Sequence, residues 1–240
     1  MIRRTALIPI LAATALAAPA PAQEMTEEEV KRLALEAILE NPEIVMEAVA
    51  ILREREAAEE EAARAEAMAS LGDALTSGEN APILGNPDGD VTLVEFYDYN
   101  CGFCRRAMPT LEALIEADPN LRVVMREFPI LSEESVAAAR VSLAAMGQPG
   151  WDGFHADLMD GPRADAAAAM EAAEAAGMDM DAIETALASG AVDEHIDQSR
   201  DLAEALGIGG TPAFVIGDQV IPGAVPLEDL QAAVEAAREG

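Results

Sequence analysis

Basic residues are scarce in this sequence of 240 residues, which has 15 lysines and arginines against 45 aspartates and glutamates. The formal net charge is therefore −30. A protein that binds the phosphate backbone of nucleic acids needs a basic face, so the charge excludes that class and no nucleic-acid partner is expected. Strong acidity favours solubility, but it does not identify a substrate.

Cysteine is almost absent, because Cys101 and Cys104 are the only two. Two cysteines are too few for a disulfide framework or a four-cysteine zinc site. The two histidines, His155 and His195, show no ligand spacing to the pair, so no metal site is expected. The eleven methionines are expected to fill gaps in the core, and they leave a copper-related role open.

Long apolar runs are also missing after the first 22 residues. Arg3 and Arg4 form a basic start, Ala6–Ala18 is mostly apolar, and Ala20–Ala22 offers small residues at alternate positions. This pattern predicts a signal peptide over residues 1–22 that is cleaved after Ala22. An uncleaved anchor is the alternative, but the run is short for a membrane span. The expected location is the bacterial periplasm or exterior, where disulfides persist.

Residues 23–80 are composed almost entirely of helix formers. Thr26 and Glu29 have the spacing of a capping box, and Asn41–Pro42 divides the segment. Apolar residues recur at helical spacing before this break (Val30, Leu33, Ala34, Ala37 and Ile38) and at three- and four-residue steps after it, with Arg55 at the one charged position: Ile44, Ala48, Ile51, Ala58, Ala62, Ala65 and Ala69. The pattern predicts an amphipathic arm that forms a homo-oligomer. A solvated linker helix is the alternative, because alanine buries little area.

Residues 81–240 have the pattern of an α/β domain. Strands are predicted over Val91–Tyr99 and Leu121–Phe128, and a hairpin over Ala213–Ile216 and Gln219–Ile221. A helical insert is expected over residues 132–207, and a closing helix over Leu227–Arg238. The order of strand, helix, strand, insert, hairpin and helix indicates an α/β fold.

The two cysteines lie where the first of these strands passes into a helix. A sulfur at a helix start lies near free backbone N–H groups and the positive end of the helix dipole, which favour thiolate over thiol. Cys101 therefore fits a nucleophile, and Cys104, one turn later, can close a disulfide with it. Attack and resolution of this kind constitute thiol–disulfide exchange.

Three motifs carry a resemblance to a known family: E-F-Y-D-Y-N-C-G-F-C (Glu95–Cys104), R-E-F-P-I-L (Arg126–Leu131) and G-T-P-A-F (Gly210–Phe214). Together they resemble the DsbA-type branch of thioredoxin-fold oxidoreductases, over roughly Pro82–Gly240. The resemblance implies a thioredoxin fold with a long helical insertion, preceded here by the N-terminal arm. It also implies no cofactor beyond a redox-active Cys101–Cys104 disulfide. Cysteine-containing secreted proteins would be the substrates, and a membrane redox partner would restore the active-site state.

The resemblance also assigns residues to substrate binding. Pro212 is implied to be a cis-proline that faces the cysteines and is preceded by Thr211. Beside a cis-proline, a backbone edge stays open for an extended substrate. Gly102 and Phe103, between the cysteines, would lie at the same surface. The alternative is that Pro212 begins an edge strand in trans.

Glu95 precedes Cys101 by six residues, where relatives carry a buried acid beneath the active site. A carboxyl among apolar neighbours holds its proton more tightly, so Glu95 could exchange a proton with Cys104. The alternative is an ordinary strand carboxylate that faces solvent, because strand alternation alone does not fix its face.

The direction of exchange depends on the two residues between the cysteines. Strong oxidants of the family carry Pro-His there, whereas this chain has Gly102–Phe103, which is similar to disulfide isomerases and ScsC-like proteins with oligomerising arms. The sequence therefore favours an isomerase or reductase. A DsbA-like dithiol oxidase is one alternative. A redox-inactive surface protein with a binding or chaperone-like role is another.

Overall fold

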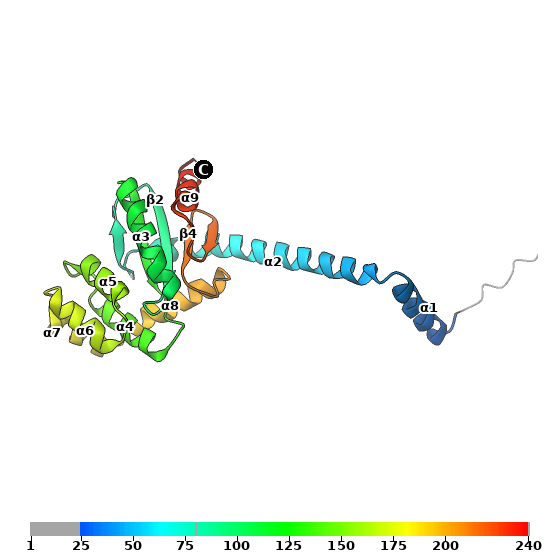
Figure 1. Ribbon diagram of the computed structural model, residues 1–240, viewed down its shortest axis with the longest axis horizontal. Coiled ribbons are helices and arrows are strands. Elements are labelled where there is room, and N and C mark those ends of the chain that lie inside the picture. Colours follow the sequence, from blue (N-terminus) through cyan, green and yellow to red (C-terminus); the bar gives the residue numbers. More distant parts are fainter. Residues whose placement is uncertain (1–24, 80, 240) are drawn as a thin grey trace, which may run out of the picture. The chain divides into compact units, whose positions relative to one another are not determined.

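The computed structural model describes residues 25–79 and 81–239 (Figure 1). The chain divides into two compact units, Met1–Glu54 and Arg55–Gly240. The predicted signal peptide lies outside the described residues. In the described part, no helix is both long enough and apolar enough to cross a membrane.

The first unit contains helix α1 (Glu27–Glu40) and the first turns of helix α2 (Glu43–Thr76). The capping box forms as predicted: the Thr26 side chain accepts from the backbone N–H of Glu29, whose carboxylate accepts from the backbone N–H of Thr26. No residue of α1 is buried. The large apolar side chains of this unit are therefore exposed: Val30, Leu33, Leu35, Ile38, Leu39, Ile44, Val45, Met46, Ile51 and Leu52.

The second unit is built on a five-stranded sheet with the order β1-β3-β2-β4-β5. The strands are β1 (Ile83–Gly85), β2 (Val91–Tyr97), β3 (Leu121–Glu127), β4 (Ala213–Ile216) and β5 (Gln219–Pro222). Strands β2 and β3 are parallel and the other pairs are antiparallel. Four strands lie where the sequence predicts them. Strand β1 was not predicted, because three residues are too few for an alternating pattern.

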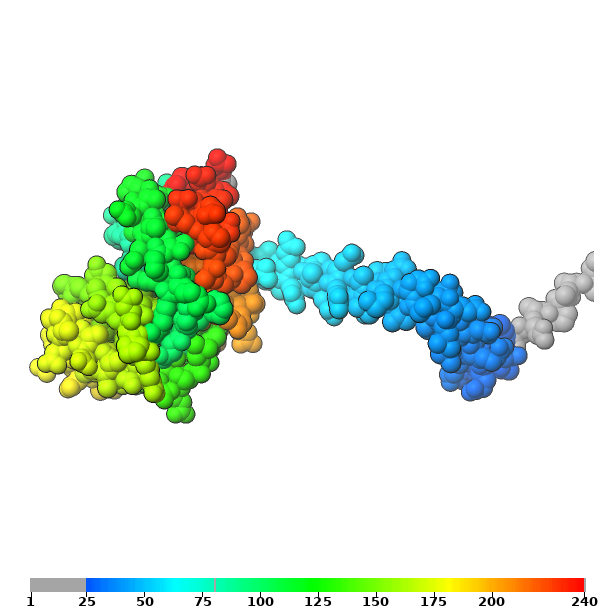
Figure 2. All heavy atoms as spheres, viewed as in Figure 1, coloured from blue at the N-terminus to red at the C-terminus, as the bar shows by residue number. Residues whose placement is uncertain are grey.

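Residues of β2 alternate between two cores. Leu93 and Tyr97 face a core that helices α3 (Gly102–Ala117) and α9 (Leu227–Glu239) cover. These two helices lie side by side, as Figures 1 and 2 show. Val94 and Phe96 face the opposite core, which contains Ala67 and Leu75 of α2. The sheet is therefore covered on both faces, as expected for an α/β fold.

The predicted helical insert consists of five helices in the structure. They are α4 (Glu133–Ala144), α5 (Trp151–Asp160), α6 (Ala166–Ala175), α7 (Met180–Ser189) and α8 (Ala191–Ala205). Ser132, Asp165 and Asp179 cap the starts of α4, α6 and α7, where their side chains accept backbone N–H groups. These caps explain where three of the five helices begin, whereas α5 and α8 follow Gly150 and Gly190, which have positive φ.

The C-terminal end of α2 is held by Arg126, a buried residue of β3. Its guanidinium donates to the carbonyl oxygens of Ala74, Leu75 and Ser77. Burial, followed by the charge of Arg122, lowers the pKa of Arg126 to about 10. The helix end, whose carbonyls lack partners within the helix, is thereby satisfied inside the protein. The carbonyl groups that Arg126 contacts belong to residues 23–80, the segment that the sequence assigns to an arm.

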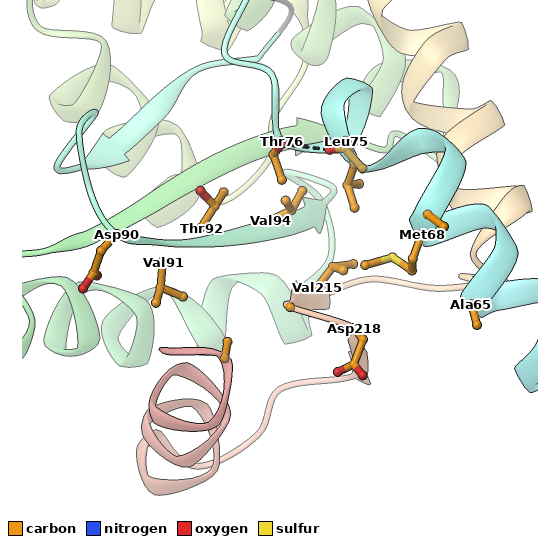
Figure 3. A pocket seen from close by; sticks show the side chains of 14 residues that line it. Ala65, Met68, Leu75, Thr76, Asp90, Val91, Thr92, Val94, Val215 and Asp218 are labelled. Atoms are coloured by element: carbon orange, nitrogen blue, oxygen red, sulfur yellow. Dashed lines mark hydrogen bonds between the residues drawn. The ribbon is translucent and has the colours of Figure 1, made fainter. Parts of the chain in front are cut away.

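A cavity of about 540 Å³ lies between the second half of α2 and the sheet (Figure 3). Its walls are mainly apolar, with Met68 of α2 opposite Val94 and Val215, and they include Asp90 and Asp218. Neither cysteine lines it. This cavity is therefore separate from the cysteine pair.

Candidate functional site

The cysteine pair lies where β2 passes into α3. Cys101 occupies the N-cap position of α3, and its backbone N–H donates to the carbonyl oxygen of Asp98 at 2.9 Å. Cys104 lies one turn into the helix and is 1% exposed. Both are free thiols. The strand-to-helix placement is the one that the sequence predicts.

Asp98 joins this turn to the loop that follows β3. Its carboxylate is buried and accepts from the backbone N–H groups of Ile130 and Leu131, both at 3.0 Å, and of Asn100 at 2.8 Å. A carboxylate with three such donors holds both segments in one geometry. Asp98 is therefore a positioning residue for the turn that carries Cys101.

Asn100 joins the same turn to the helical insert. Its side-chain amide donates to the carbonyl oxygen of Ala164 at 2.7 Å and accepts from the Ala164 N–H at 2.9 Å. It also donates to the Ser135 hydroxyl at 3.1 Å. Sequence reasoning missed both Asp98 and Asn100. Short polar side chains directly before a helix start were the available signal, since they bond backbone groups of turns.

The structure brings the Thr211–Pro212 pair to the nucleophile candidate. Strand β4 pairs with β2 in the register Phe96↔Ala213, which places Pro212 near the end of β2. The Thr211–Pro212 bond is cis, as the resemblance implies. The Cys101 thiol donates to the Thr211 carbonyl oxygen at 3.2 Å. Residues more than a hundred positions apart thus meet at one site.

Gly102 and Phe103 form the first turn of α3 beside this contact. Phe103 is 57% exposed, and the Arg106 guanidinium lies 4.2 Å from the centre of its ring. An exposed aromatic ring next to a nucleophile offers apolar contact area to a substrate. The cation above the ring holds it in place and adds positive charge at the surface.

Opposing effects act on the Cys101 thiol. Burial raises its pKa, whereas hydrogen bonding to the Thr211 side chain, to the backbone and thiol of Cys104 and to the backbone of Phe103 lowers it. The lowering effects are larger, so the pKa of Cys101 lies below the ordinary thiol value. A sulfur at a helix N-terminus is expected to behave in this way.

Cys104 and Glu95 differ from Cys101 in the direction of their shifts. Glu95 is 2% exposed, and burial followed by the charge of Cys101 raises the pKa of Glu95 to about 8. Burial, followed by the charge of Glu95, raises the pKa of Cys104. At neutral pH the geometry therefore holds protons on Glu95 and Cys104 and favours their loss from Cys101.

A cluster of buried polar side chains lies on the same side of the sheet as Glu95. Tyr97 donates to Glu127 at 2.5 Å, and Tyr99 is hydrogen-bonded to His155 Nδ1 at 2.8 Å. His155 also stacks on Trp151. Burial lowers the pKa of His155 to about 3, so this histidine is neutral and belongs to the packed interior. Within the described residues, no group of three or more histidine, cysteine, aspartate or glutamate side chains could hold a metal ion.

The sheet, its helical insert and the cysteine turn together define a thioredoxin-like fold. The family model of the DSBA-like thioredoxin domain matches residues 92–235, which is more than half of the chain. The chain belongs to this family.

Two solved structures are similar over most of their length. A thioredoxin-like oxidoreductase from Silicibacter pomeroyi is 46% identical, with a TM-score of 0.66, and the match covers 70% of this chain and 98% of that one. ScsC of Proteus mirabilis is 31% identical, also with a TM-score of 0.66, and the match covers 89% of this chain and 97% of that one. The ScsC match thus extends well beyond the thioredoxin-like region.

Curated relatives are more distant. The thiol:disulfide interchange protein DsbA of Bordetella parapertussis is 28% identical over 144 residues, which is 58% of this chain and 68% of that protein. The Na(+)/H(+) antiporter NhaA 1 of Salinispora arenicola is 29% identical over 162 residues, which is 66% of this chain. The match spans only 25% of the antiporter.

The lowered pKa of Cys101 predicts the pH dependence of its alkylation. In the reduced protein, the rate of reaction with iodoacetamide should rise to half its maximum at a pH below the ordinary thiol value of 9.0. Cys104 should stay unmodified. Thr211→Val removes the side-chain hydrogen bond and should move the midpoint to higher pH. Thr185→Val, on the exposed face of α7, is the control. A midpoint that is unchanged in Thr211→Val would contradict this assignment.

The raised pKa of Glu95 predicts how stability depends on pH. The folded protein keeps a proton on Glu95 up to about pH 8, whereas the unfolded chain releases it near 4.5. The stabilising contribution of the protonated Glu95 carboxyl is therefore complete below its pKa in the unfolded chain. It is lost as the pH rises through its pKa in the folded protein. Relative to wild type, Glu95→Gln should gain on the order of 2–3 kcal/mol in unfolding free energy between about pH 5 and 8.

Urea unfolding of the reduced proteins at both pH values measures this gain. Glu112→Gln, at an exposed position on α3, is the control and should show no such change. An equal difference between Glu95→Gln and wild type at the two pH values would show that Glu95 is ionised in the folded state.

Proposed function

We propose that this protein is a thiol-disulfide oxidoreductase whose active site is the Cys101–Cys104 pair. The observation that carries the proposal is the position of the Cys101 sulfur, which lies at a helix N-terminus, 3.2 Å from the Thr211 carbonyl oxygen next to cis-Pro212. A stabilised thiolate, a buried partner thiol and an adjacent peptide edge are what thiol–disulfide exchange requires.

The first step is attack of the Cys101 thiolate on a substrate disulfide. A bond forms between Cys101 Sγ and one substrate sulfur, the substrate S–S bond breaks, and the other substrate sulfur leaves as a thiolate. The product is a mixed disulfide. Thr211 and Pro212 hold the substrate backbone, and Gly102 and Phe103 offer a surface with little steric hindrance and one exposed ring.

The second step resolves the mixed disulfide in one of two ways. In isomerisation, another substrate thiolate attacks, a new substrate disulfide forms, and Cys101 is released with no net oxidation. In reduction, Cys104 loses its proton and attacks Cys101 Sγ, which leaves a Cys101–Cys104 disulfide and a reduced substrate. Glu95, whose charge acts on Cys104, can accept that proton in its ionised form, and this form becomes populated as the pH approaches about 8.

The residues between the cysteines favour isomerase or reductase chemistry. A histidine between the cysteines would stabilise the thiolate further, and this chain has Gly102–Phe103 instead. His155 cannot take that role, since it is buried and bonded to Tyr99. The lowered pKa of Cys101 still favours its reduced state, which supports dithiol oxidation as the second candidate.

The substrates and partners follow from this chemistry. We propose cysteine-containing secreted proteins as substrates in the periplasm, which the chain would reach by way of the predicted signal peptide over residues 1–22. Reduction leaves the active site oxidised, so a membrane redox partner would supply electrons to restore it. The redox-active disulfide would be the only redox group required.

The exposed apolar residues of the first unit support a homo-oligomer. Val30, Leu33 and Ile38 lie on one face of α1 at helical spacing, and all three are more than 40% exposed. Helices with such a face are stabilised by packing against another copy. Several active sites around one substrate would keep a misfolded chain bound while its disulfides rearrange.

Refolding of a protein with scrambled disulfides in glutathione buffer tests the reaction. The mature chain should restore the native activity of that protein, and Cys101→Ser should lower the rate more than about a hundredfold because the nucleophile is lost. Cys104→Ser should retain part of the isomerase activity, since isomerisation requires only Cys101. Rapid oxidation of a reduced dithiol peptide without refolding activity would instead identify an oxidase. Refolding activity that does not depend on Cys101 would contradict the enzyme and support the alternative, a redox-inactive binding protein.

Sedimentation of the mature chain tests the oligomer. Leu33→Glu places a charge on the proposed contact face and should raise the dissociation constant by at least about tenfold. Leu39→Glu makes the same change on the opposite face of the same helix and should leave the assembly intact. Equal effects of the two substitutions, or a monomeric wild type, would contradict the proposed seam.

A further inference from the structure

A groove of about 460 Å³ begins at the candidate active site. Thr211 and Pro212 line one part of it, and Gly207, Gly209 and Gly210 line the segment that follows α8. The Thr211 carbonyl oxygen that contacts Cys101 Sγ belongs to this lining segment. A peptide bound at the cysteine can therefore continue directly into the groove.

The glycines keep the floor of this groove low. At Gly209 and Gly210, a side chain would meet no atom within 4 Å, so the space above their backbone is open. Open backbone next to a redox site suits an extended peptide, whose main chain can approach closely while its side chains point to either wall. The groove thus has the shape for a substrate segment that flanks the reactive cysteine.

Of the described residues that line the groove, Arg64 of α2 alone has a charged side chain. Its Nε donates to the carbonyl oxygen of Leu206 at 3.3 Å, at the C-terminal end of α8. That bond leaves both terminal nitrogens of the guanidinium available. Among the described residues Arg64 forms no ion pair, although Glu60 and Glu204 line a neighbouring groove with it. A fixed cation with available donors therefore faces the substrate groove.

Two arginines lie near the nucleophile although the chain is strongly acidic. The sequence has three acidic residues for each basic one, yet Arg64 lines the groove and Arg106 lies over Phe103. A guanidinium binds a carboxylate with directed, charge-assisted hydrogen bonds. In a protein of net charge −30, a local cation also offsets the repulsion that an acidic substrate would otherwise meet.

We infer that Arg64 recognises a carboxylate side chain close to the reactive cysteine in the substrate, and so gives the enzyme a preference for acidic sequences around the disulfide. The inference rests on the proposed function, because the groove is a substrate site only if Cys101 is the nucleophile. Arg64 acts in specificity, and the exchange chemistry itself does not need it.

Reduction of short cyclic peptides by the reduced full-length protein tests this inference. Each peptide contains one disulfide and one test residue, which is Glu, Gln or Lys. Across the set, the test residue lies at increasing distance from one cysteine or the other. The protein's own dithiol supplies the electrons: the peptide disulfide becomes a dithiol as Cys101 and Cys104 form a disulfide. At the best position, wild type should reduce the Glu peptide about fivefold faster than the Gln peptide, and the preference should shrink at high salt.

Arg64→Gln should lower the ratio of the Glu-peptide rate to the Gln-peptide rate below about twofold. Arg64→Lys keeps the charge and should retain most of the preference. Arg55→Gln makes the same charge change at an exposed position of α2 and should retain all of it. An unchanged preference in Arg64→Gln, or no preference at any position, would overturn the inference and leave the proposed function intact. If the wild-type protein reduces none of the peptides, both the inference and the proposed function are overturned.

Discussion

The buried carboxylate of Asp98 fixes the turn on which the candidate active site depends. It accepts backbone N–H groups from its own turn and from the loop after β3, so two segments about thirty residues apart share one anchor. The Asp98 carbonyl oxygen also accepts the Cys101 N–H. Asn100 extends this network to the helical insert through Ala164. With the turn held from both sides, the first turn of α3 begins at Cys101, and the sulfur is directed toward Thr211 rather than toward solvent.

That placement makes the two thiols different although only two residues separate them. Cys101 lies at the helix N-terminus, where hydrogen bonds favour its thiolate, while Cys104 lies beneath it beside Glu95. Burial acts on all three groups, but only Cys101 has enough compensating hydrogen bonds to offset it. The two thiols therefore differ in reactivity: Cys101 attacks, and Cys104 reacts only after it has lost its proton. Glu95 matters because it is a buried carboxyl whose charge acts on Cys104 and which, once ionised, can take that proton.

The sequence predicts the parts of this structure that depend on local pattern. The strand predicted over Val91–Tyr99, which ends at Tyr97 in the structure, the helix start at Cys101 and the cap at Thr26 follow from residue types at short spacing. The Thr211–Pro212 turn could be placed beside the cysteines only through the resemblance, because no local pattern shows which distant segment meets a strand end. Strand β1 is three residues long and pairs with β3, so its formation depends on a partner that follows it by about forty residues. Asp98 and Asn100 are ordinary polar residues until the loops that they bond are in place.

Helix α2 shows most clearly why local pattern is insufficient. Its alanine-rich second half has the spacing of a weak oligomerisation seam, yet Ala67 and Leu75 are buried against the sheet. The reason is Arg126, whose guanidinium satisfies the carbonyls at the end of α2 and so allows that end to lie in the interior. Once the end is fixed, the position of Arg64 three turns earlier is fixed as well, and its side chain reaches the end of α8. A contact that stabilises the fold thus also determines which charge faces the groove beside Cys101.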